Sequence, residues 1–184
     1  MNKTIVIAGM LSLAAMLSGA ENLMKKPETS YKVFPGRWYQ ELLKSKTLGP
    51  TIDPDLDRAT NKRKGLLADG KTFQRAVVYN YHRTPQDQCF VTIEVDLGKP
   101  VTVAEIRVMT VENNDMYHPA KIEVAGGADN LKWTEFGTSA EWAKKGYVLT
   151  ASLKGEWKEC RFLQIKVYTS KSWINVSEIE VYGK

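Results

Sequence analysis

The chain of 184 residues is poor in the side chains that build most reactive sites, with only two histidines and two cysteines. So few of these residues exclude a multi-histidine metal cage, a zinc ribbon and a dense disulfide scaffold. After residue 20, no apolar run approaches the length of about 20 residues that a membrane-spanning helix needs. The basic excess is also small, 26 residues against 21 acidic ones, so the charge gives little support for nucleic-acid binding.

The remaining composition is that of an ordinary folded protein. Hydrophobic residues make up 43% of the chain and charged residues 26%, which argues against a disordered or fibrous protein. The length predicts one domain with short appendages. Aromatic residues make up 10%, which suits a β-rich core or an aromatic-lined site.

Residues 1–20 have the layout of a secretory signal peptide. Lys3 supplies a positive start, residues 5–17 are almost wholly apolar, and Ser18 and Ala20 place small residues before a cut after Ala20. An uncleaved membrane anchor is the alternative interpretation. The signal peptide predicts an exported protein, secreted or periplasmic, whose mature chain begins at Glu21.

From residue 90 onward, apolar and polar residues alternate in short runs. In residues 91–97 the odd positions are apolar and the even ones polar, as in a half-buried strand. Further strands are predicted at 101–111, 120–125, 133–136, 147–153, 161–167 and 175–182. The alternation slips near 103–104, which predicts a β-bulge or a strand start. Many short strands with turn residues between them, and no convincing long helix, predict an antiparallel sandwich or barrel.

The segment 21–65 differs from the rest of the chain. It is richer in proline and basic residues, and only Trp38 to Lys44 within it looks helical. Its apolar side chains give it enough surface to pack on the sandwich, so we interpret it as an N-terminal extension. A flexible tether is the alternative.

Several blocks of the sequence resemble a known family in its own order. These blocks are residues 66–70, 91–98, 119–124, 128–133, 161–165 and 177–183, with Asp69-Gly70 in the first and Glu178 in the last. Together they resemble the discoidin domains, also called coagulation factor V/VIII type C domains, whose fold includes carbohydrate-binding module family 32. The resemblance implies an all-β, eight-stranded antiparallel jelly-roll sandwich (galactose-binding-domain-like) over residues 66–184.

The resemblance also implies a structural calcium ion. In many sugar-binding relatives this ion joins the loop at the Asp-Gly pair to the C-terminal glutamate, which correspond here to Asp69 and Glu178. Carbonyl groups around Lys71, Thr72 and Ser177 could complete the oxygen ligands that calcium prefers. The alternative is a turn closed by the Asp69 side chain, with Glu178 as an exposed strand carboxylate.

Three predicted loops carry aromatic and polar side chains suited to sugar binding. Sugars stack their C–H faces on aromatic rings and pair their hydroxyl groups with polar side chains. The candidate ligand-binding residues are Tyr81, His82 and Arg83 in the first loop, Asn113, Tyr117 and His118 in the second, and Trp173, near Asn175, in the third. For Trp173 and Tyr81, packing against the rim of the sandwich is an equal alternative.

The remaining reactive residues do not form a recognisable catalytic motif. His82 and His118 belong to no metal-binding or hydrolase pattern, so we expect no enzymatic activity. Cys89 and Cys160 each start a predicted strand. They form either a disulfide or two buried thiols, and neighbouring antiparallel strands would keep them apart.

These observations predict an exported, non-catalytic module that recognises carbohydrate or a glycan surface through its loops. A protein–protein adaptor in an extracellular or periplasmic complex is the alternative. Lipid binding through apolar loop tips is less favoured, because the loops are polar.

Overall fold

The computed structural model describes residues 20–35, 56–57, 62–63, 65–73, 75–80, 89–112, 119–155, 157, 159–171 and 173–184. The strands within this part are β1 (Glu21–Asn22), β2 (Ser30–Pro35), β3 (Leu56–Asp57), β4 (Lys62–Arg63), β5 (Val77–Asn80), β6 (Phe90–Val101), β7 (Val103–Val111), β8 (Pro119–Gly127), β9 (Thr134–Ser139), β10 (Ala143–Lys145), β11 (Val148–Lys154), β12 (Cys160–Thr169), β13 (Trp173–Val176) and β14 (Glu178–Gly183). Two short 3-10 helices, η1 (Leu23–Lys25) and η2 (Leu66–Ala68), are the only helices in the described residues. The predicted signal peptide before Ala20 and the predicted helix 38–44 lie outside them.

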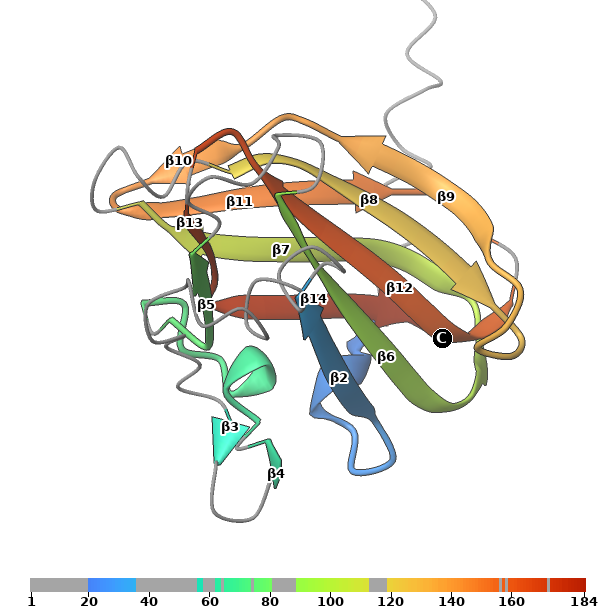
Figure 1. Cartoon of the computed structure of the whole chain (residues 1–184). Helices are drawn as coiled ribbons and strands as arrows, with labels where there is room; N and C mark the ends of the chain where they lie inside the picture. The colour runs from blue at the N-terminus through green and yellow to red at the C-terminus, as the bar shows by residue number, and fades with distance from the viewer. Residues whose placement is uncertain are drawn as a thin grey trace, which may run out of the picture.

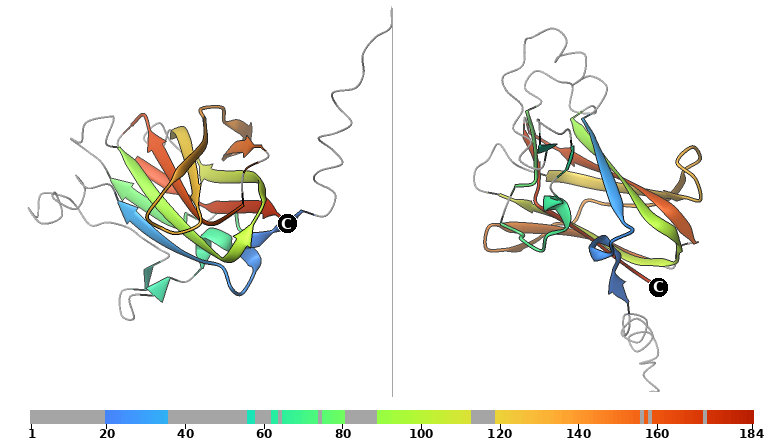
Figure 2. Two further views of the ribbon diagram at one scale, coloured as in Figure 1. Left: turned by 90° about the vertical axis from the view of Figure 1, so that its right-hand side faces the viewer. Right: turned by 90° about the horizontal axis from the view of Figure 1, so that it is seen from below.

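Two antiparallel sheets of five strands pack face to face (Figures 1 and 2). The first sheet has the order β1-β14-β7-β11-β10, and the second has the order β2-β6-β12-β8-β9. Eight of these ten strands follow residue 89, and β1 and β2 come from the N-terminal segment. The predicted all-β antiparallel sandwich is confirmed.

The core lies between the two sheets, where the predicted alternation places the apolar side chains. On β6 and β12 of the second sheet, buried residues alternate with more exposed ones over most of each strand. The inward side chains of β8 in the same sheet, and of β7 and β14 in the first sheet, pack against these buried residues. The central members of this core are Val91, Ile93, Val95, Ile106, Val108, Ile122, Leu163, Ile165, Ile179 and Val181. Burial of these aliphatic side chains is the main favourable contribution to folding.

The predicted irregularity near residues 103–104 is a β-bulge on β7. Tyr182 of β14 lies opposite Glu105, but the next residue, Gly183, lies opposite Val103, so Ala104 is an extra residue on β7. A bulge of this kind reverses which residues face inward, and this explains the slip in the alternation.

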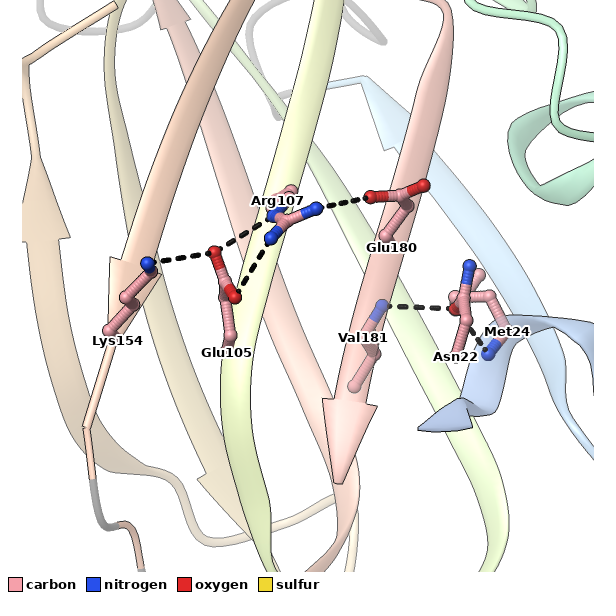
Figure 3. A network of polar contacts seen from close by, with 7 residues as sticks. All are labelled: Asn22, Met24, Glu105, Arg107, Lys154, Glu180 and Val181. Carbon is pink, nitrogen blue, oxygen red and sulfur yellow. Dashed lines mark hydrogen bonds and ion pairs between the residues drawn. The ribbon is translucent and has the colours of Figure 1, made fainter. Parts of the chain in front are cut away.

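The N-terminal segment contributes one strand to each sheet. Strand β1 pairs with β14 in the first sheet, and β2 pairs with β6 in the second. Asn22 fastens the segment, because its Oδ1 accepts hydrogen bonds from the N–H groups of Met24 at 3.1 Å and Val181 at 3.3 Å (Figure 3). Residues 21–35 are therefore part of the sandwich itself.

A row of ion pairs crosses the outer face of the first sheet (Figure 3). The buried carboxylate of Glu105 accepts hydrogen bonds from Nε and Nη2 of Arg107 at 2.8 and 3.1 Å, and Lys154 lies 3.7 Å away. Arg107 also reaches Glu180 at 3.4 Å. Because Glu105 is only 1% exposed, its charge depends on these partners, and the row ties β11, β7 and β14 together.

The two cysteines are buried at opposite ends of neighbouring strands. Cys160 pairs with Val101 at one end of β12, whereas the N–H of Thr169 at the other end donates to the carbonyl of Cys89 at 3.0 Å. At about 3.3 Å per residue, the ten residues of β12 separate these ends by roughly 30 Å. The Cα atoms of a disulfide lie within about 7 Å, so the structure excludes the intramolecular disulfide and leaves two buried thiols.

Candidate functional site

Trp173 lies at one end of the sandwich, where β13 begins. This strand pairs with β5, and Trp173 lies opposite Asn80, the last residue of β5 (left in Figure 1). The Trp173 side chain is half-buried, and with Pro119 it lines a small cavity of about 10 Å³. The half-buried state leaves part of the indole open to solvent, which is compatible with both stacking on a ligand and packing at the rim.

The described residues next to the three predicted loops are neighbours at this end. Asn80 immediately precedes the first loop, and Pro119 immediately follows the second. Asn80 pairs with Trp173, and Trp173 shares the small cavity with Pro119. The described residues Asn80, Pro119 and Trp173, which flank or belong to the three predicted loops, thus lie at one end of the molecule. The six candidate residues of the first two loops, Tyr81, His82, Arg83, Asn113, Tyr117 and His118, lie outside the described residues.

Asn175 has a structural role that its position in the sequence did not reveal. Its side chain is 3% exposed, accepts a hydrogen bond from the N–H of Val111 at 2.9 Å and donates one to the Val111 carbonyl at 2.9 Å. Two residues on, Ser177 contacts the Met109 carbonyl through its N–H at 2.8 Å and its hydroxyl at 3.0 Å. Hydrogen bonds therefore hold β13, which begins at Trp173, against the end of β7 that precedes the second loop.

The turn that contains Asp69 is joined to Glu178 by a hydrogen bond from its backbone. Glu178 begins β14, and its Oε1 accepts a hydrogen bond from the N–H of Gly70 at 3.0 Å. Asp69 closes its own turn, since its Oδ1 accepts from the N–H of Lys71 at 2.8 Å. The predicted turn at Asp69 is thus present, but Glu178 is 1% exposed and is not the exposed strand carboxylate of the alternative interpretation.

The Glu178 carboxyl is poorly compensated for a buried acid. Its Oε2 is buried and has no hydrogen-bond partner among the described residues. The pKa of Glu178 is raised to about 7, mainly by burial and also by the neighbouring Asp69 and Glu180 carboxylates, while the N–H of Gly70 and the Lys25 ammonium oppose the rise. A buried carboxyl oxygen without a partner, under the electrostatic influence of a second carboxylate, favours the binding of a cation.

Two features bear on whether these residues fit a calcium ion. The described residues contain no group of three or more His, Cys, Asp or Glu side chains that could hold a metal, so carbonyl groups or water would supply the other ligands. Calcium takes six to eight oxygen ligands of these kinds, and the unsatisfied Oε2 of Glu178 offers one directly. The Lys71 ammonium, 3.5 Å from Oδ2 of Asp69, competes for the same charge but is well exposed and can turn away.

Within the described residues, no helix is long and apolar enough to cross a membrane.

Solved structures of several carbohydrate-binding modules share this fold. The family 32 module of NanJ from Clostridium perfringens, solved with galactose, has 13% identity and a TM-score of 0.56, covering 89% of this chain and 97% of that one. The module CBM32-5 from Clostridium perfringens, solved with GalNAc-β-1,3-galactose, has 11% identity and a TM-score of 0.59, covering 88% and 98%. CBM32-3 from a family 31 glycoside hydrolase of the same organism has 16% identity and a TM-score of 0.59, covering 92% and 98%.

The sequence itself matches a family model. No curated protein matches the chain, but the model of the F5/8 type C domain matches residues 57–180. This match covers most of the chain and agrees with the antiparallel sandwich that the structure shows. The chain therefore belongs to the F5/8 type C domain family.

Proposed function

We propose that this protein is an exported, non-catalytic module that binds carbohydrate through the three loops around Trp173. The observation that supports the proposal is that Asn80, Pro119 and Trp173, which flank or belong to these loops, are neighbours at one end of the sandwich. Loops on a rigid β-scaffold commonly carry recognition sites. The first two loops supply Tyr, His, Arg and Asn side chains, and Trp173 supplies an aromatic face.

The relatives indicate which sugars to test first. Two modules of the same fold were solved with galactose and with GalNAc-β-1,3-galactose. We infer that galactose-containing glycans are the class of ligand for this chain. The side chains of the three loops support a non-catalytic role, because their residue types suit hydrogen bonding and stacking and match no known catalytic motif.

Isothermal titration of the mature chain 21–184 with galactose and GalNAc-β-1,3-galactose, together with a glycan array, tests this proposal. We expect Trp173→Ala and His118→Ala to weaken binding about tenfold or more, the equivalent of about 1.4 kcal/mol. Phe73→Ala is the matched control, because Phe73 is an aromatic residue with 73% exposure that precedes β5, at the end opposite Asn80. Binding to no glycan, or binding that all loop substitutions leave unchanged, would contradict the proposal and favour a protein–protein adaptor.

Export has its own test. If residues 1–20 are a signal peptide, the protein recovered from the periplasm or medium begins at Glu21. Intact-mass measurement of that protein distinguishes this chain from one that retains its N-terminus in the membrane.

We also propose that Asp69 and Glu178 hold a structural calcium ion. The buried, unsatisfied Oε2 of Glu178 beside a second carboxyl group supports this proposal. A ligand that binds only the folded state at 100 times its dissociation constant stabilises it by about 2.7 kcal/mol. We therefore expect calcium to raise the free energy of unfolding by about this amount relative to the protein in EDTA.

The variant Glu178→Gln should abolish this stabilisation, and the exposed Glu141→Gln should retain it. Equal unfolding curves of the wild-type protein in calcium and in EDTA would refute the calcium site without bearing on the sugar-binding loops.

A further inference from the structure

An open trough lies on the outer face of the second sheet, and none of its lining residues lines the small cavity beside Trp173. It has a volume of about 340 Å³, within the range of small-ligand sites. Its lining comes from β8, β12 and the start of β9, which lie side by side in the sheet (Figure 1). The lining residues are Glu123, Val124, Ala125, Trp133, Glu135, Gln164 and Lys166.

The register of the strands explains why a trough forms there. Ala125 of β8 lies between Glu135 of β9 and Gln164 of β12, so a methyl group is flanked by two longer side chains. Gly127 follows Ala125 on the same face of β8 and has no side chain at all. Ala125 forms the floor of the trough, which ends at Gly127, where the carbonyl oxygens of Asp129 and Lys132 fill the space of a side chain. Trp133 lies at the edge of the trough.

The polar groups of the trough are held in place by neighbours in the sheet. The carboxylate of Glu123 accepts hydrogen bonds from the Lys121 ammonium at 2.6 Å and the Tyr168 hydroxyl at 2.7 Å. The amide of Gln164 donates to Glu94 at 3.3 Å. Side chains already fixed in this way lose little conformational entropy when a ligand binds.

Hydrogen-bonding capacity remains after these contacts. A carboxylate has about four lone-pair sites, and the two bonds to Glu123 leave the others available. Gln164 keeps its carbonyl oxygen and a second N–H, and Lys166 adds ammonium donors. A surface that offers donors and acceptors together matches hydroxyl groups, which both donate and accept.

The charges around the trough favour an uncharged ligand. Glu123 and Glu135 would repel an anion, while Lys121 and Lys166 would repel a cation. The half-exposed indole of Trp133 provides an apolar face of the kind on which the C–H groups of a sugar ring stack. An apolar peptide segment would find little apolar surface, because Val124 and Ala125 are the other apolar residues of the lining.

From these contacts we propose that the trough is a second carbohydrate-binding site, which takes a short uncharged oligosaccharide lying along β8. This second site shares no residue with the three loops, so it can be tested separately from the proposed function. If both sites bind, one chain can hold one polysaccharide at two places. The overall affinity for the polysaccharide then exceeds that of either site alone, because the second binding event is intramolecular.

The indole resonances of the mature chain in nitrogen-15 NMR spectra report on the two sites separately. The five tryptophans give separate indole signals, which Trp133→Phe and Trp173→Phe assign. The probes are galactotetraose, cellotetraose and laminaritetraose at millimolar concentrations. We expect at least one tetrasaccharide to shift the Trp133 signal and the amide signals of Glu123, Ala125 and Gln164, and to do so equally in Trp173→Ala.

Two variants at different places in the trough, Trp133 before β9 and Gln164 on β12, guard against a loss of binding that comes from misfolding of one variant. Trp133→Ala and Gln164→Ala should each weaken this binding about tenfold, the equivalent of about 1.4 kcal/mol, while Phe73→Ala leaves it unchanged. Shifts confined to the Trp173 signal, or no shift of the Trp133 signal by any tetrasaccharide, would overturn the proposal. Shifts at Trp133 without any at Trp173 would support the trough and count against the proposed function instead.

Discussion

Replacing Glu178 with glutamine should remove a pH dependence that this one buried carboxyl group imposes on stability. In the folded protein without calcium, burial raises the pKa of Glu178 to about 7, whereas its ordinary value is 4.5. The folded state therefore holds a proton that the unfolded state has already released between these two pH values. By linkage, stability falls as the pH rises through this window.

The magnitude follows from the two pKa values. Each pKa unit corresponds to about 1.4 kcal/mol, so the full difference is worth up to about 3 kcal/mol. This contribution is fully present below about pH 4.5 and is lost above about pH 7. Glutamine keeps an oxygen that can accept the hydrogen bond from Gly70 but cannot ionise.

Urea unfolding in EDTA from pH 4 to pH 9 measures the free energy of unfolding of the wild type and of Glu178→Gln. Subtracting one free energy from the other at each pH removes the contribution of the other titrating groups, which the two proteins share. We expect equal stabilities near pH 4 and a variant that is more stable by up to about 3 kcal/mol near pH 8. With calcium added at about 100 times its dissociation constant, the two proteins should become about equally stable at pH 8 if the ion sits on Glu178. Parallel curves for the two proteins in EDTA would refute the claim that Glu178 is buried and uncompensated.

Three further expectations follow from single contacts. Asn175→Ala should lower the free energy of unfolding in urea by about 2–4 kcal/mol, because it leaves the buried N–H and carbonyl of Val111 without partners. An unchanged free energy of unfolding would contradict this prediction. Gly98→Ala should lower the free energy of unfolding by about 1–3 kcal/mol, since Gly98 has a φ of 79° and an added Cβ would lie 2.7 Å from the Cβ of Glu28. A melting temperature at or above that of the wild type would argue against this prediction. Reducing agent should leave the melting temperature unchanged, and a thiol reagent should modify Cys89 and Cys160 only on unfolding, because both are buried and burial raises the pKa of Cys160 to about 11.

The local pattern of the sequence was enough to predict the class of fold and most strands after residue 90. The predicted strand 175–182 was wrong as one strand, because it divides at Ser177 into β13 and β14, and β10 was not predicted. Alternating residues such as Val91, Ile93 and Val95 predict which side of a strand is buried, because side chains on a strand point to opposite faces in turn. The slip at residues 103–104 even located the bulge at Ala104. The ordered family motifs added the link between Asp69 and Glu178, which no local pattern contains.

The rest depended on which strands are neighbours and in which register they pair. Only the tertiary structure showed that β1 and β2 belong to the sheets, that Asn175 clamps Val111, and that Glu178 is buried. The trough depends on the same information, because the small size of Ala125 matters only next to Gln164 and Glu135. Such contacts join residues far apart in the chain, so the alternation of a single strand determines its own faces but not the side chains that it will meet across the sheet.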